Sequence, residues 1–155
     1  MDLKCLTLAA VFLVFGGLEM LSQTGKSSMG SGCRTGNLRE EAANTVVAIT
    51  SFLGELQDAV KKDNREIVAK LISYPLLVSM PSGKLHVRSE EEFLGSYRKI
   101  FPEKLIRLLL EQKAECISRV GAQGFTIGNG QIWFDVFPDG KVRVFTITPV
   151  VLRNE

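Results

Sequence analysis

Residues 131–148 read QIWFDVFPDGKVRVFTIT, and this stretch decides the fold class. Runs of β-branched and aromatic residues flank the turn letters PDG at 138–140. Such an arrangement is typical of an antiparallel hairpin. Apolar residues occupy both alternations of the first run, with Ile132 and Phe134 on one face and Trp133 on the other. We therefore expect both faces to be covered, by helices and, as one option, by a partner subunit.

The β pattern extends upstream of this hairpin. Asn129-Gly130 suits a tight turn, or a bulge within a long strand. We predict about three or four antiparallel strands after residue 114, on the period-2 pattern. Three of them fall at 116–120, 131–137 and 141–148.

The part of the chain before these strands has helical periodicity. Within 39–62, apolar residues recur at alternating spacings of three and four: Val46, Ile49, Leu53, Leu56 and Val60. This stripe predicts a long helix that faces a core. A short second helix is expected over 63–72, opened by Asp63 and Glu66 as a capping-box-like pair.

A hairpin is predicted between the helical segments. Its strands lie at 76–80 and 85–88, around a Pro-Ser-Gly-Lys turn. Ser89 and Glu92 then form an S-x-x-E capping box that opens a third helix. Pro102 ends that helix and can occupy the first position of another.

Helices followed by strands, without strict β-α alternation, indicate an α+β domain. We expect a single domain over 39–150, with a curved antiparallel sheet of about five to six strands wrapped around about three to four helices.

Two stretches resemble exported bacterial members of the nuclear transport factor 2-like superfamily. KKDN at 61–64, followed by YPL at 74–76, is similar to their gap between short helices and their Tyr-Pro strand. GNGQIWF at 128–134, followed by DGK at 139–141, looks like their carboxy-terminal hairpin. The resemblance spans 40–149 and implies a cone-shaped fold with room for a pocket and often a dimer. It implies no reaction and transfers no catalytic residue, because the superfamily includes isomerase-like enzymes, ligand binders and dimerisation modules.

The first 38 residues are expected to lie outside the fold. An uncharged run of fourteen residues, from Cys5 to Leu18, follows Lys4. Its length suits a signal peptide, whereas a bilayer-spanning helix needs about 20 residues. We predict a signal peptide over 1–21, a flexible leader over 22–38, and export to the periplasm or the medium. The alternative is an uncleaved anchor, which would be the protein's one contact with a membrane.

The net charge argues against some classes of partner, and the number of cysteines indicates the cellular compartment. A net charge of +2 argues against nucleic acid or an anionic membrane surface as a partner. Signal cleavage would remove Cys5 and leave Cys33 and Cys116. An even number of cysteines in an oxidising compartment favours a disulfide between them. The alternative is two unrelated thiols, one exposed and one buried.

Acid–base chemistry has two candidates, His86 and Asp135. His86 is the one histidine of the chain and the natural general base. We favour an exposed or merely packed His86, on the strand face opposite Leu85. Asp135 is a buried base if it faces the cone. If it points outward, which we favour, it is a solvated cross-strand partner of Arg143.

Neither a metal nor a cofactor is expected. One histidine cannot make a two-histidine site, and the chain lacks C-x-x-C, H-E-x-x-H and acidic calcium-loop motifs. Four aromatic residues could line a ligand pocket, although we favour their being ordinary core side chains. They are Tyr74, Tyr97, Trp133 and Phe145.

The sequence thus favours a non-catalytic exported module that binds an unknown protein or a small hydrophobic ligand, with a homodimer as one option. The alternative is a small lyase or isomerase that acts on a hydrophobic molecule in the cone. It would use Asp135 or His86 as the base and Tyr97 or Tyr74 as the proton donor.

Overall fold

The computed structural model of the chain describes residues 36–150, all of which lie in one compact unit, Ser31–Glu155. The predicted signal peptide, Cys33 and the leader up to residue 35 lie outside the described residues. The described helices are η1 (Leu38–Glu40), α1 (Ala43–Lys61), α2 (Arg65–Lys70), α3 (Glu90–Ile100), α4 (Glu103–Glu111), η2 (Ala114–Cys116) and η3 (Gly121–Gln123). The described strands are β1 (Ile72–Met80), β2 (Gly83–Val87), β3 (Ser118–Arg119), β4 (Phe125–Ile127), β5 (Ile132–Val136) and β6 (Val142–Ile147).

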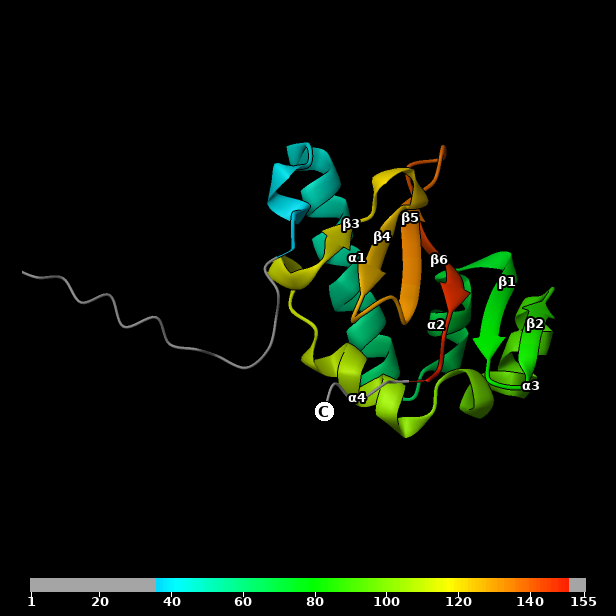
Figure 1. Cartoon of the computed structure of the whole chain (residues 1–155). Helices are drawn as coiled ribbons and strands as arrows, with labels where there is room; N and C mark the ends of the chain where they lie inside the picture. Colours follow the sequence, from blue (N-terminus) through cyan, green and yellow to red (C-terminus); the bar gives the residue numbers. More distant parts are fainter. Residues whose placement is uncertain (1–35, 151–155) are drawn as a thin grey trace, which may run out of the picture. The chain divides into compact units, whose positions relative to one another are not determined.

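The predicted α+β class is confirmed. Six strands form one open sheet in the order β2-β1-β6-β5-β4-β3 (Figure 1). Every pairing is antiparallel except that of β1 with β6, which is parallel. The sheet is therefore mixed, and its parallel pair joins the β1–β2 hairpin to the carboxy-terminal strands.

Helices α1 and α2 lie against one face of the sheet. In Figure 1, α1 and α2 lie behind the strands. Phe52 of α1 packs on Phe134 of β5, with ring centroids 5.1 Å apart, and Phe134 stacks on Phe125 of β4 at 5.7 Å. Both sheet phenylalanines are fully buried. Truncating Phe134 to alanine would cost about 3–5 kcal/mol of stability, because it would leave a cavity among rings.

The opposite face has no helix over it among the described residues, so its cover by a partner subunit stays a prediction. No described helix crosses the front of β4, β5 and β6 in Figure 1. On β5, Ile132 and Phe134 are buried, whereas Trp133 stays partly exposed. Within the described residues the helices therefore cover one face of these strands, not both.

Two local boundaries also differ from prediction. Asn64, rather than Asp63, caps α2, because its Oδ1 accepts from Ile67 N at 3.2 Å. Asp63 instead takes a left-handed φ of 50° and pairs with Arg65. Ile72 is expected at the end of that helix, but it begins β1 and pairs with Val144 of β6. In this position its side chain is buried in the core.

The amino-terminal end of the described chain packs on the body. Gly36 N donates to Glu115 O at 2.8 Å, and Asn37 Oδ1 accepts from Arg119 N at 2.7 Å. Leu38 is 2% exposed. We call residues 36–41 the strap. It lies beside β3, an edge strand of the sheet, and its first three residues belong to the segment that the sequence assigned to the leader.

Candidate functional site

The two tyrosines among the pocket candidates lie on the helix-covered side of the sheet, in an aromatic cluster. Phe93 of α3 makes edge contacts with both, with centroid distances of 6.5 Å to Tyr74 and 5.7 Å to Tyr97. Tyr97 also stacks on Phe101 at 5.3 Å. Tyr74 Oη donates to Ala69 O at 3.1 Å. Here the tyrosines act as core side chains.

Tyr97 has an unusual environment for a hydroxyl group. The residue is 3% exposed, and its Oη has no hydrogen-bond partner among the described residues. The Arg65 guanidinium lies 5.2 Å from its ring centroid. Burial raises the pKa of the Tyr97 phenol, and nearby Asp63 adds to the rise while Arg65 opposes it.

Trp133 and Phe145 do not join this cluster. Trp133 pairs across the sheet with Thr146, on the face opposite Phe134, and its Nε1 donates to Gly130 O at 3.0 Å. Phe145 is the extra residue of a β-bulge in β6, because Trp133 pairs with Thr146 while Phe134 pairs with Val144. The four pocket candidates are thus not gathered around one cavity.

The three candidate acid–base residues lie apart. His86 is exposed on β2, Tyr97 is buried on α3, and Asp135 is partly exposed on β5. Three strand spacings separate β2 from β5, which amounts to about 14 Å. No single substrate atom can meet His86 and Asp135 together at that spacing.

Asp135 has a different ion partner from the expected one. Arg143 is its register partner on β6, but the Arg143 guanidinium pairs with Asp139 in the β5–β6 turn. Asp135 Oδ1 lies 3.9 Å from an Arg119 nitrogen and accepts from Val136 N at 2.8 Å. Arg119 in turn contacts Glu41 of the strap at 2.7 Å and lies 4.3 Å from the Phe125 ring centroid. Asp135 therefore supports the join between the strap and the sheet edge.

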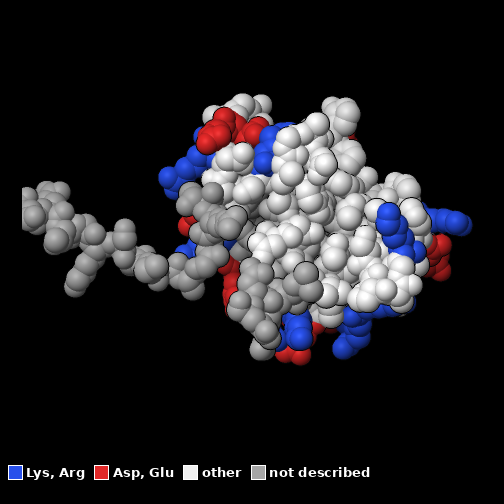
Figure 2. All heavy atoms as spheres, in the orientation of Figure 1, with Lys and Arg blue, Asp and Glu red and all other residues white. Residues whose placement is uncertain are grey.

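One row of side chains crosses the whole sheet on the face away from the helices. Successive register pairs join one residue from each strand. We call this set the outer row: His86, Leu77, Thr146, Trp133, Thr126 and Ser118. None of the six carries a fixed formal charge, and all of them are at least partly exposed except Thr126, which is 8% exposed. In Figure 2 an uncharged area lies over these strands, with lysine, arginine and acidic side chains at its margins. An apolar and hydroxyl-bearing centre with a charged rim is typical of a protein interface.

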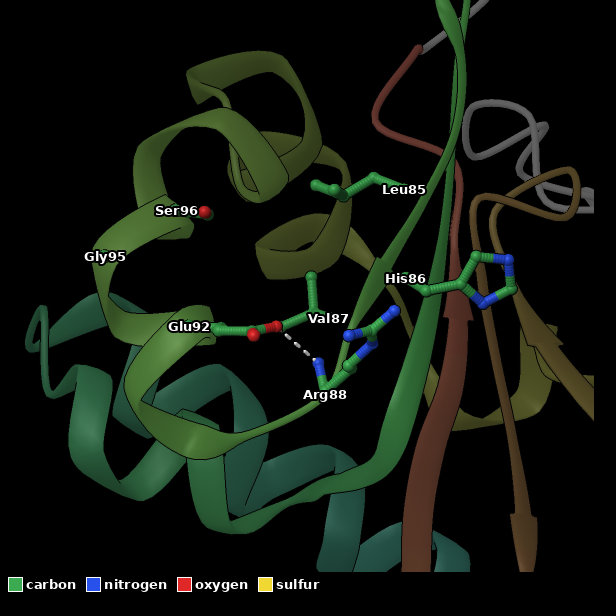
Figure 3. A pocket seen from close by; sticks show the side chains of 7 residues that line it. All are labelled: Leu85, His86, Val87, Arg88, Glu92, Gly95 and Ser96. Atoms are coloured by element: carbon green, nitrogen blue, oxygen red, sulfur yellow. Dashed lines mark hydrogen bonds between the residues drawn. The ribbon is translucent and has the colours of Figure 1, made fainter.

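A second feature is a groove between β2 and α3, of about 560 Å³. Leu85 and Val87 point into it, and Glu92 and Ser96 approach from α3 (Figure 3). His86 points to the other side of β2 (Figure 3). Glu92 Oε2 accepts from Arg88 N at 2.7 Å, which closes one end of the groove. The residues that line this groove form no sequence motif, because the groove exists only where strand β2 and helix α3 pack together.

Cys116 is disulfide-bonded, and its partner lies outside the described residues, since the other two cysteines of the chain are Cys5 and Cys33. The strap places Gly36, three residues after Cys33, in a hydrogen bond with Glu115. Three residues reach at most about 11 Å, so Cys33 can approach Cys116. The pairing of Cys33 with Cys116 stays a prediction that this geometry supports.

Neither a group of metal-binding side chains nor a membrane-spanning helix is present among the described residues. Within 36–150, no three or more histidine, cysteine, aspartate and glutamate side chains form a group suited to a metal ion. No helix in that range has both the length and the apolar character needed to cross a bilayer.

The sequence matches no protein-family model, and comparison with curated proteins and with solved structures gives no match.

Proposed function

We propose that the protein is a non-catalytic, exported interaction module whose contact surface is the sheet face that carries the outer row. The observation that carries this proposal is the uncharged row across all six strands, bordered by charged side chains. Its partner is a protein that presents a similarly uncharged, partly apolar surface, because charged groups would lose hydration on it without gaining ion partners.

Two further observations support the proposal. The disulfide at Cys116 is a state that persists in oxidising compartments, which favours export. The order of helix pair, hairpin, helix pair and carboxy-terminal strands favours the nuclear transport factor 2-like resemblance. The Tyr74–Pro75 step lies in β1, and residues 139–141 lie in the turn that joins β5 to β6.

Site-specific photo-crosslinking in the native host tests this function. A photoreactive amino acid at Thr146, in the middle of the outer row, should give one discrete adduct. The same amino acid at Val47, which is 69% exposed on α1, should give none. An adduct of twice the chain's mass would identify a second copy as the partner.

Leu77→Arg should abolish the Thr146 adduct, because it places an unpaired cation in the uncharged row. Val47→Arg is the matched control and should leave the adduct in place. Circular dichroism checks that both variants fold. Equal crosslinking from Thr146 and Val47, or no adduct at Thr146, would overturn the proposal.

The lyase or isomerase alternative has one observation in its favour, the buried Tyr97 hydroxyl without a partner among the described residues. Buried hydroxyls normally bind protein groups, water or a ligand. If a small molecule satisfies Tyr97, native mass spectrometry of the purified protein will show a retained ligand that Tyr97→Phe loses. A ligand-free spectrum for both proteins removes this support.

A further inference from the structure

The free side of β2 is an accessible strand edge. In the described sheet β2 is terminal and pairs with β1 alone. In an antiparallel pair about half of the backbone N–H and C=O groups point away from the partner strand. Such an edge can accept another extended chain through main-chain hydrogen bonds. Arg88 N already donates to Glu92, so the available edge is Gly83–Val87.

Basic side chains occupy one face of this edge. Lys84, His86 and Arg88 alternate along the strand, and all three are exposed. Their register partners on β1 supply no acid, since Lys84 faces Ser79 and His86 faces Leu77. Within residues 36–150, no ion pair engages the side chains of Lys84 or Arg88. Two fixed cations and a histidine are therefore available to an acidic partner.

The other face of the same edge is apolar and recessed. Leu85 and Val87 border the groove, and Gly95 of α3 leaves its wall open, since a Cβ at that glycine would have no atom within 4 Å. Glu92 places a carboxylate at one end of the groove. That carboxylate disfavours acidic side chains on this face and leaves apolar ones favoured.

We propose that the β2 edge binds an extended peptide in which acidic and apolar residues alternate. The backbone adds a seventh strand beside β2. Acidic side chains pair with the Lys84 and Arg88 cations and accept a hydrogen bond from His86, and the intervening apolar side chains enter the groove between β2 and α3. This site shares His86 with the outer row, and it does not depend on the outer-row contact.

Charge excludes a second copy of this strand as the occupant. Two β2 edges would bring two sets of Lys84 and Arg88 together, and like charges on neighbouring strands are destabilising. An acidic strand would instead place negative charges opposite these basic side chains, and this contact would be attractive. The charge pattern thus selects the partner and also prevents edge-to-edge aggregation.

The binding test uses the full chain and a fluorescein-labelled pentapeptide of sequence Glu-Val-Glu-Val-Glu, with fluorescence anisotropy as the readout. Lys84→Glu/Arg88→Glu should weaken binding by at least about tenfold, because two attractive pairs become repulsive. Lys61→Glu/Lys104→Glu is the matched control, with the same change in net charge on exposed sites of α1 and α4, and it should change binding less than about twofold.

Three further measurements separate strand pairing from general attraction. The isomer Glu-Glu-Val-Val-Glu should bind weakly, because it loses the alternation. N-methylation of the peptide should weaken binding when it blocks N–H groups that face β2, and not when it blocks the others. A Lys-Val-Lys-Val-Lys peptide should bind the Lys84→Glu/Arg88→Glu variant. Equal binding of the two Glu/Val isomers, or equal loss in the variant and its control, would overturn the proposal.

Discussion

At the scale of single residues, Gly36 shows how a backbone contact selects an amino acid. A Cβ at this position would lie 1.9 Å from Ile117 O and 2.8 Å from Cys116 C. Both obstacles are backbone atoms and cannot rotate away. The glycine is therefore required by the close approach of the strap to the Cys116–Ile117 segment, next to the disulfide-bonded cysteine.

Gly36→Ala should destabilise the protein by about 1–3 kcal/mol, because the strap must move away from Ile117. Urea denaturation of the oxidised protein measures the change. Gly54→Ala in α1 is the matched control, since no atom lies within 4 Å of its Cβ position, and it should stabilise by about 0.5–1 kcal/mol. A Gly36→Ala midpoint equal to that of the parent protein would show that the strap does not approach Ile117 this closely.

The raised pKa values of the two tyrosines predict how the absorbance and the stability of the protein change at high pH. Burial raises the pKa of Tyr74 above its ordinary value of 10.0, with Glu90 adding to the rise, and burial also raises the pKa of Tyr97. A pKa raised in the folded state gives a stability contribution that is complete below about pH 10 and is lost as the pH rises further. Tyrosinate absorbance at 295 nm should therefore stay low in native protein at pH 10.5 and appear on unfolding. A titration midpoint near 10 with native circular dichroism would contradict this expectation.

At the scale of elements, the start of α3 shows a cap that the local sequence predicts. Ser89 Oγ accepts from Glu92 N at 3.2 Å, as expected from the S-x-x-E pattern. The Glu92 carboxylate reaches back to Arg88 N, one residue before the expected Ser89 N. The same cap therefore binds the backbone N–H that follows β2 and stabilises the first turn of α3.

Ser89→Ala should cost about 1 kcal/mol of stability, because the first turn of α3 loses a hydrogen-bond acceptor for its free N–H groups. Ser96→Ala, within the same helix, serves as the control and should change stability by less than about 0.5 kcal/mol. Chemical denaturation compares the two. If both substitutions have the same effect, the cap does not stabilise α3.

At the scale of the whole molecule, the strap joins the start of the described chain to the β3 edge of the sheet. The strap contributes Asn37, Leu38 and Glu41 to this join. Arg119 lies between Glu41 and the Phe125 ring. Strand β3 is an edge strand of only two residues. The Arg119–Glu41 ion pair, which lies over the Phe125 ring, and the nearby disulfide-bonded Cys116 shield this edge.

Cys116→Ser should lower stability by about 2–4 kcal/mol, because the unfolded chain gains conformational freedom. Cys33→Ser should have the same effect, the double variant should be no worse than either single variant, and Cys5→Ser should have none. Mass spectrometry of a non-reduced digest identifies the bridge directly. A bridge to Cys5, or one between two chains, would refute the predicted pairing.

Much of the fold could be predicted from local patterns. Periodicity located α1, the β1–β2 hairpin, α3 and the β5–β6 hairpin, because each buries one face and ends at a recognisable cap or turn. Long-range contacts account for what was missed. The strand register of Ile72, the burial of Leu38 and the ion partner of Asp135 all depend on segments distant in sequence.

The sequence by itself determined the α+β class, the order of its main elements and the small net charge, since these follow from local hydrophobic patterns and composition. Only the tertiary structure decided which side chains meet. The pairing of β1 with β6 aligned the outer row, and the packing of α3 beside β2 formed the groove. Tertiary packing also separated His86, Asp135 and Tyr97. The physical reason is that a surface depends on register and on contacts between distant segments, and no local pattern encodes either one.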